Sequence, residues 1–174
     1  GGMGAHSPAP VMDAGLEAQV MQRIVQPTVD AMKAEGCPYQ GVLFAGLMIE
    51  GGEAKLLEHN VRFGDPECQA LMMRLKSDIV PALFAAAEGQ LKNLDLRWYD
   101  DAAMVVVMAA KGYPGSYEKG SEIRGIKAAA EQAEVTVFHA GTRRGEEGEL
   151  RAAGGRVLGI AARGATIREA RDRA

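Results

Sequence analysis

The sequence has no excess of basic charge, little cysteine and no long apolar run, and each shortage excludes a class of protein. Its 174 residues carry 20 lysines and arginines against 23 aspartates and glutamates, so the composition does not indicate a nucleic-acid partner. Cys37 and Cys68 are too few for a disulfide framework, which fits a reducing cytosol. The longest apolar run, Ala102 to Ala110, is well short of the about 20 residues that a spanning helix needs, and no signal peptide opens the chain. We therefore expect a soluble cytoplasmic protein without a membrane partner.

Two common nucleotide-binding signatures are also missing, because the sequence has neither a Gly-Lys-Ser/Thr P-loop nor a Gly-x-Gly-x-x-Gly motif after a strand. The first ten residues, rich in glycine and proline, predict a loop whose backbone amides can approach an anion closely, and a flexible linker is the alternative. The chain begins without an initiator methionine and ends inside a helical pattern that runs from Thr166 to Ala174. We therefore expect an excised piece of a longer protein.

The apolar spacing predicts a mixed order of helices and strands. Expected helices cover residues 13–35, with a kink near Val25 or two abutting helices because of Pro27. Further helices are expected at 65–75 and 78–89, and a capping box at Thr166 opens the last one. Expected strands cover residues 41–50, 52–60, 103–109, 135–139 and 156–161, the first two forming an antiparallel hairpin through Gly51-Gly52. The stretch from Lys92 to Asp101 is polar and poorly periodic. We therefore expect a boundary between two parts of the chain near Arg97.

Polar side chains gather where the strand over residues 52–60 ends. Strand alternation places Leu56, Glu58 and Asn60 on one face. A carboxylate and an amide oxygen projecting side by side are hard ligands of the kind that Mg²⁺ prefers, with room left for water and phosphate oxygens. Arg62 adds a forked cation that suits phosphate. The pattern predicts a site for a metal ion and a phosphate group.

A helix is expected to start directly after these residues, since Asp65 is a good N-cap and Pro66 suits the first helical position. Taken singly, Glu58 could be a solvated strand residue, Asn60 a turn former and Asp65 only a cap. Because so many oriented polar groups meet at one strand-to-helix junction, we favour a functional site.

The same stretch resembles a signature of the glycinamide ribonucleotide synthetases, also called phosphoribosylamine-glycine ligases, which are ATP-grasp enzymes. The sequence there is Arg62-Phe63-Gly64-Asp65-Pro66-Glu67-Cys68-Gln69. The Glu58-x-Asn60 pair resembles the family's metal-binding strand. Residues 1–8 resemble its Gly-Gly-Met-Gly-Ala-Tyr-Ser-Pro segment, with His6 in place of the tyrosine, and residues 112–120 resemble its Gly-Tyr-Pro-Gly-x-Tyr-x-x-Gly loop.

The resemblance implies an α+β fold in two domains. Residues 1–97 would form the second half of an ATP-grasp domain, an antiparallel sheet with helices. Residues 98–174 would form a small C-terminal α/β domain, truncated at its end. The N-terminal domain and the ATP-binding lid of the family would precede this chain.

The resemblance also implies an activity, which is the ATP-dependent ligation of glycine to 5-phosphoribosylamine through a glycyl phosphate, a step of purine biosynthesis. Its partners would be glycine, 5-phosphoribosylamine and ATP, with Mg²⁺ or Mn²⁺ as the metal, while the oligomeric state is not predicted. The implied catalytic residues are Arg62 and Asp65. The implied metal ligands are Glu58 and Asn60, and these two residues bind the cofactor together with Leu57. The implied substrate-binding residues are Gly1, Gly2, Met3, Gly4, Ser7, Pro8, Arg62 and Asp65.

Two other interpretations stay open. The chain could be an inactive fragment or structural module of such an enzyme, because it has no lysine-bearing lid or glycine-rich loop for the nucleotide. It could also come from an ATP-grasp ligase that joins a different carboxylate to a different amine.

Overall fold

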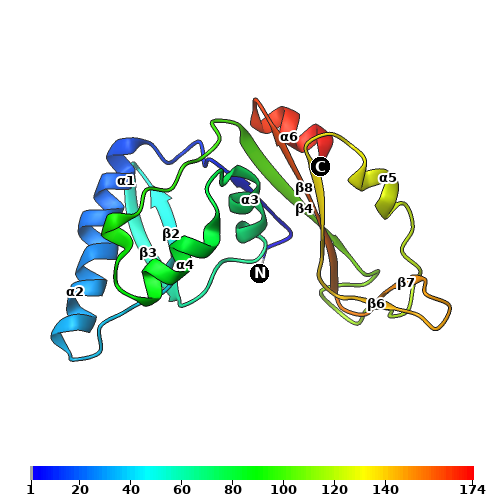
Figure 1. Ribbon diagram of the computed structural model, residues 1–174, viewed down its shortest axis with the longest axis horizontal. Helices are drawn as coiled ribbons and strands as arrows, with labels where there is room; N and C mark the ends of the chain where they lie inside the picture. The colour runs from blue at the N-terminus through cyan, green and yellow to red at the C-terminus, as the bar shows by residue number, and fades with distance from the viewer. Residues whose placement is uncertain (1) are drawn as a thin grey trace. The chain divides into compact units, whose positions relative to one another are not determined.

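The computed structural model describes residues 2–174, and contacts group them into two compact units (Figure 1). One unit contains residues 8–64 and 76–97, and the other contains residues 2–7, 65–75 and 98–174. The expected boundary near Arg97 coincides with one of the points where the chain passes between them. The division into domains 1–97 and 98–174 stays a prediction. The compact units group the chain differently, because the helix over residues 67–74 packs against strands of the later unit.

The unit of residues 8–64 and 76–97 is built on a two-stranded antiparallel hairpin of β2 (Phe44–Glu50) and β3 (Glu53–Asn60). Gly51 and Gly52 join the strands, as predicted, with φ of 60° and 81°; a two-residue turn of type I′ needs positive φ at both positions. The other elements of this unit are α1 (Ala14–Val20), η1 (Met21–Val25), α2 (Gln26–Ala34), α4 (Ile79–Ala87) and η2 (Leu91–Asn93).

The helical stretch before the hairpin follows local sequence signals. Asp13 caps α1 by accepting a hydrogen bond from the Leu16 amide at 2.8 Å. The segment η1 is a π-helical turn that ends directly before the turn containing Pro27, where the proline cannot donate an amide hydrogen bond. Where a kink or two abutting helices were expected, the structure has a widened turn between α1 and α2.

The other unit contains a four-stranded antiparallel sheet in the order β1-β4-β8-β5. Its strands are β1 (Gly4–Ser7), β4 (Ala102–Ala109), β8 (Arg156–Gly164) and β5 (Val135–His139), and a separate hairpin pairs β6 (Thr142–Arg144) with β7 (Leu150–Ala152). Its helices are α3 (Glu67–Arg74), α5 (Ile126–Ala130) and α6 (Ile167–Arg173). The predicted α+β class is confirmed.

The first residues differ from the expected loop, because residues 4–7 form the edge strand β1 on β4. Gly4 permits this pairing, since a Cβ at this position would lie 2.9 Å from the carbonyl oxygen of Val105. Val105 itself is completely buried and forms a core with Ala70 of α3 and Ala161 of β8. The start of the chain is therefore tied to the core of this unit.

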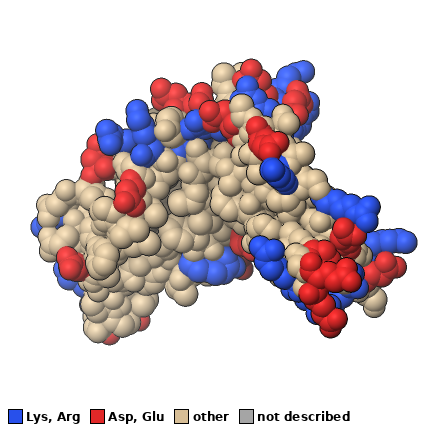
Figure 2. All heavy atoms as spheres, turned by 45° about the vertical axis from the view of Figure 1, so that its right-hand side comes forward, with Lys and Arg blue, Asp and Glu red and all other residues tan. Residues whose placement is uncertain are grey.

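Among residues 2–174, no helix is long and apolar enough to cross a membrane. The face in Figure 2 shows acidic and basic side chains mixed together, densely so around the β6–β7 hairpin. Arg143, Arg144, Glu146 and Glu147 of that hairpin line a shared hollow. The charge on this face is of both signs.

Candidate functional site

Strand β3 contains a bulge immediately before the predicted metal ligands. Glu58 pairs with Gly46 and Leu56 pairs with Leu47, so Leu57 is an extra residue without a partner on β2. A bulge shifts the alternation of side chains by one residue, and this places Leu56 and Glu58 on opposite faces. The expectation that Leu56 shares a face with Glu58 is therefore wrong.

The two faces of β3 have different neighbours. Leu56 and His59 line a hollow together with Thr28 of α2, and His59 Nε2 lies 3.1 Å from the Thr28 hydroxyl. Leu57 is 63% exposed. Leu56 and His59 thus lie on the side of the strand that faces α2, and Glu58 and Asn60 project from the other side.

The polar end of β3 forms one continuous line of side chains. Asn60 Nδ2 donates a hydrogen bond to Glu58 Oε1 at 3.0 Å, and Arg62 Nη2 donates to Asn60 Oδ1 at 3.2 Å. Arg62 Nη1 also donates to the carbonyl of Phe63 at 2.8 Å. The carboxylate, the amide and the guanidinium therefore lie next to one another, as their spacing in the sequence predicts.

This arrangement suits a divalent metal held by few protein ligands. In the part of the chain that the structure describes, no cluster of three or more His, Cys, Asp or Glu side chains could hold a metal. Glu58 and Asn60 offer two adjacent oxygen donors, and Glu58 is exposed. Mg²⁺ typically takes one or two carboxylates and completes its shell with water and phosphate oxygens. To ligate with its oxygen, Asn60 would exchange its contacts with Glu58 and Arg62 for the ion.

Asp65 does not cap the helix that follows it, so this prediction is wrong. Helix α3 begins at Glu67, and Pro66 precedes it without a side-chain cap. The Asp65 carboxylate instead binds the guanidinium of Arg156 through Oδ2 and accepts a hydrogen bond from Gln69 Nε2 at 3.1 Å. Both carboxylate oxygens are engaged with side chains, so they are not directed at the amides of α3.

Arg156 was not identified from the sequence, although it contacts two of the predicted site residues. Its Nη1 donates to the carbonyl of Gly2 at 2.8 Å and to the carbonyl of Asp65 at 3.0 Å. The only local signal was an arginine at the start of a predicted strand, directly after the pair Gly154-Gly155. That signal does not identify its partners, which lie 154 and 91 positions away in the sequence.

The remaining substrate-binding candidates are hydrogen-bonded within the sheet-containing unit or are exposed. Gly1 lies outside the described residues. The carbonyl of Met3 accepts a hydrogen bond from the Val107 amide at 2.9 Å, and Ser7 Oγ accepts one from Arg74 Nη1 at 2.8 Å. Pro8 is exposed and begins the other compact unit. His6 also is exposed, on the side of β1 opposite Ala5, which packs on the core.

The predicted site residues therefore fall into two groups, each within its own compact unit. Glu58, Asn60 and Arg62 form the line at the end of β3. Gly2 and Asp65 are joined through Arg156 in the unit that contains the four-stranded sheet.

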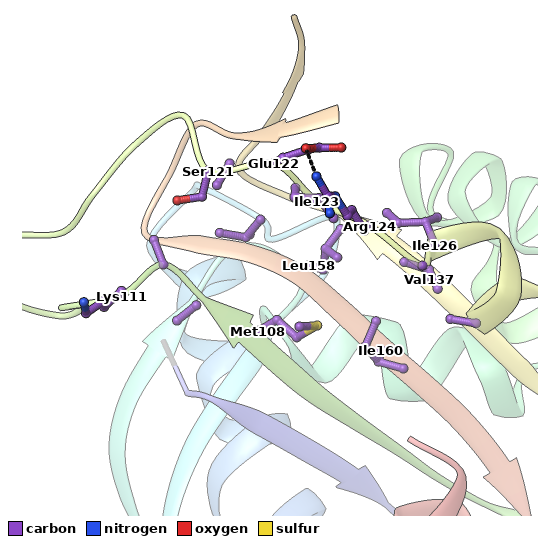
Figure 3. Close-up of a pocket in the computed structure, with 16 residues that line it drawn as sticks. Met108, Lys111, Ser121, Glu122, Ile123, Arg124, Ile126, Val137, Leu158 and Ile160 are labelled. Carbon is purple, nitrogen blue, oxygen red and sulfur yellow. Dashed lines mark hydrogen bonds and ion pairs between the residues drawn. The ribbon is translucent and has the colours of Figure 1, made fainter. Parts of the chain in front are cut away.

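A separate pocket of about 400 Å³ lies in the sheet-containing unit (Figure 3), and no predicted site residue lines it. Its apolar wall includes Met108, Leu158 and Ile160, which register places on the face of the sheet opposite the Val105 side chain. Arg124 and Glu122 form an ion pair of 2.7 Å at its border.

Comparison with known families gives two matches to the same enzyme family. Residues 1–68 match the model described as phosphoribosylglycinamide synthetase, ATP-grasp (A) domain. Residues 103–174 match the model described as phosphoribosylglycinamide synthetase, C domain.

Curated relatives and a solved structure agree with these matches. The chain is 58% identical over its whole length to the chloroplastic phosphoribosylamine–glycine ligase of Arabidopsis thaliana, of which it covers 33%. It is 55% identical to phosphoribosylamine–glycine ligase of Vigna unguiculata, of which it covers 57%. The crystal structure of the Thermotoga maritima phosphoribosylamine–glycine ligase superposes with a TM-score of 0.83 at 32% identity, over 99% of this chain and 41% of that one.

The chain thus spans between a third and three fifths of the length of these curated relatives. Both family models are described as phosphoribosylglycinamide synthetase, and the relatives and the solved structure are all named phosphoribosylamine–glycine ligase. The chain belongs to the phosphoribosylglycinamide synthetase family of ATP-grasp enzymes.

Proposed function

We propose that the whole protein containing this chain ligates glycine to 5-phosphoribosylamine at the expense of ATP, giving glycinamide ribonucleotide for purine biosynthesis. The observation that carries the proposal is the line of Glu58, Asn60 and Arg62 at the end of β3. It places oxygen donors for a divalent cation beside a cation for phosphate, in a chain whose relatives are named as this ligase.

The reaction would proceed in two steps. A carboxylate oxygen of glycine attacks the γ-phosphorus of ATP, which releases ADP and forms glycyl phosphate. The amine of 5-phosphoribosylamine then attacks the glycyl carbonyl, phosphate leaves, and the nitrogen loses a proton. Mg²⁺ or Mn²⁺, when bound, would neutralise charge on the ATP phosphates that otherwise repels the attacking carboxylate.

The residues of this chain would divide the work of the first step. Glu58 and Asn60 would hold the cation, with the exposed Leu57 beside them in the nucleotide region. The Arg62 guanidinium would stabilise the negative charge of the phosphoryl group during transfer. Its Nη1 donates a hydrogen bond to the Phe63 carbonyl at 2.8 Å. This contact would stay when Asn60 ligates the cation, and it leaves the remaining N–H groups for phosphate oxygens.

Asp65 and the first eight residues would act on the other substrates. Asp65 could receive the glycine ammonium or orient Arg62, and its carboxylate has lone pairs beyond those used by Arg156 and Gln69. The segment of Gly1, Gly2, Met3, Gly4, Ser7 and Pro8 would contact the phosphoribosyl substrate.

Two further parts of the proposal concern the chain itself and its location. The 174 residues alone would be inactive, since they span only part of the relatives' length. The location would be cytoplasmic, because both cysteines are free thiols, as in a reducing compartment. The Arabidopsis relative, in contrast, is named as chloroplastic.

The test uses the full-length protein with ATP, Mg²⁺, glycine and 5-phosphoribosylamine. We expect ADP and glycinamide ribonucleotide to form together, and both to be lost when any one substrate is omitted. A panel with alanine or serine in place of glycine tests the alternative of another ATP-grasp ligase, and faster turnover of a different pair would overturn the proposal. Calorimetry of the isolated chain with Mg-ATP should show no tight saturable binding; such binding would contradict the inactivity of the fragment.

A further inference from the structure

Arg156 occupies a fixed position in the sheet-containing unit. It is the first residue of β8, a strand paired on one side with β4 and on the other with β5. Its carbonyl accepts a hydrogen bond from the Gly141 amide at 2.9 Å. Only 19% of its side chain is exposed. The guanidinium therefore extends from a backbone that is held on several sides.

The loop of residues 112–120 braces the turn just before Arg156. The Tyr113 ring lies against Gly155, so that a Cβ there would be 2.6 Å from Tyr113 Cε2 and 3.2 Å from Tyr117 Cε1. The two rings meet edge to face with centroids 6.0 Å apart. Before the loop, the Ala110 amide donates a hydrogen bond to the Gly155 carbonyl at 2.8 Å. At its end, the Gly120 amide donates one to the Ala152 carbonyl at 2.8 Å.

The guanidinium of Arg156 joins two segments that the proposed function places near substrate. Nη2 binds the Asp65 carboxylate, and Nη1 donates hydrogen bonds to the backbone carbonyls of Asp65 and Gly2. A charge-assisted contact of this kind restricts the carboxylate rotamer more than a neutral hydrogen bond does. Without Arg156, only the hydrogen bond from Gln69 Nε2 would hold the Asp65 side chain, of which 55% is exposed.

We propose that Arg156 is a positioning residue of the ligase, which holds the Asp65 carboxylate and the Gly2 carbonyl in place. The loop of residues 112–120 would fix Arg156 in turn, through the packing of Tyr113 and Tyr117 on Gly155. The proposal rests on the function proposed above. It gives the loop motif of residues 112–120 a role in the reaction, exerted through Gly155 and Arg156 on Asp65.

The test is a double-mutant cycle of Arg156→Ala and Asp65→Asn in the full-length enzyme. Misplacing a reacting group by about 1 Å can cost roughly 100-fold in rate, so we expect kcat of Arg156→Ala to fall by about that factor while KM for ATP stays within about twofold. Because Arg156 acts through Asp65, the double variant should lose little more than either single variant. Arg156→Lys keeps the charge without the fork and should recover part of the loss, and added methylguanidinium should partly rescue Arg156→Ala.

Arg163→Ala is the matched control, since Arg163 lies on the same strand, is 17% exposed and also pairs with carboxylates, those of Asp101 and Glu134. We expect this variant to lose melting temperature without a comparable loss of kcat. Equal losses of kcat in the two arginine variants, or multiplicative losses in the double variant, would overturn the positioning role.

If Arg156→Ala does not fold, the cycle is run with Arg156→Lys. An inactive wild-type enzyme would refute the proposed function, whereas an active wild type with kcat of Arg156→Ala within about threefold would refute only this inference.

Discussion

The Asn60 side-chain amide donates a hydrogen bond to the Glu58 carboxylate at 3.0 Å. Both residues project from the end of β3 that follows the bulge at Leu57, and the oxygen of the same amide contacts Arg62 at 3.2 Å. Asn60 therefore links the Glu58 carboxylate to the Arg62 guanidinium, and its removal should weaken the binding of both the cation and the phosphate group.

The first prediction concerns this link. Asn60→Leu in the full-length enzyme removes one oxygen donor and the partner of Arg62, and we expect the Mg²⁺ concentration for half-maximal turnover to rise by about tenfold or more. The measurement is a Mg²⁺ titration of ADP formation at saturating substrates. An unchanged midpoint would show that Asn60 does not bind the cation.

The second prediction concerns the support behind Arg156. Gly155→Ala introduces a methyl group where the Tyr113 ring lies, and overpacking of this kind typically costs about 1–3 kcal/mol of unfolding free energy. Urea unfolding measures the loss. Adding Tyr113→Leu to Gly155→Ala should relieve the clash and recover part of the stability. A Gly155→Ala variant as stable as the wild type would contradict the packing described here.

The third prediction concerns the two cysteines. Burial, together with the charge of Asp65, raises the pKa of the Cys68 thiol, whereas Cys37 is exposed. A raised pKa leaves less of the reactive thiolate at neutral pH. Iodoacetamide should therefore modify Cys37 before Cys68, and the rate at Cys68 should keep increasing as the pH becomes alkaline. Peptide mass spectrometry measures both rates, and faster modification of Cys68 at neutral pH would contradict the prediction.

Features set by neighbouring residues were predictable from the sequence. The Gly51-Gly52 hairpin, the Asp13 cap and the irregularity before Pro27 each depend on the chemistry of a few adjacent positions. The capping box is present as well: Thr166 Oγ1 accepts a hydrogen bond from the Glu169 amide at 3.1 Å. The spacing of Glu58 and Asn60 also sufficed to place them side by side.

Features set by distant pairing were not predictable in the same way. The edge strand β1 exists because β4 lies beside it, and the bulge at Leu57 depends on its register against β2. Asp65 has the local signature of a helix cap, yet an arginine 91 positions away takes its carboxylate. The contacts of Arg156 with Gly2 and Asp65 likewise join segments that are far apart in the sequence.

The claim that Glu58 is a metal ligand is tested most directly by the turnover of Glu58→Ala in the full-length enzyme, beside Glu53→Ala as a control. Glu53 is another exposed carboxylate of the same strand. We predict that Glu58→Ala lowers turnover by at least about a hundredfold, the scale of a lost oriented charge contact, while Glu53→Ala stays within about twofold of the wild type. Near-normal turnover of Glu58→Ala would contradict the metal site and the function built on it.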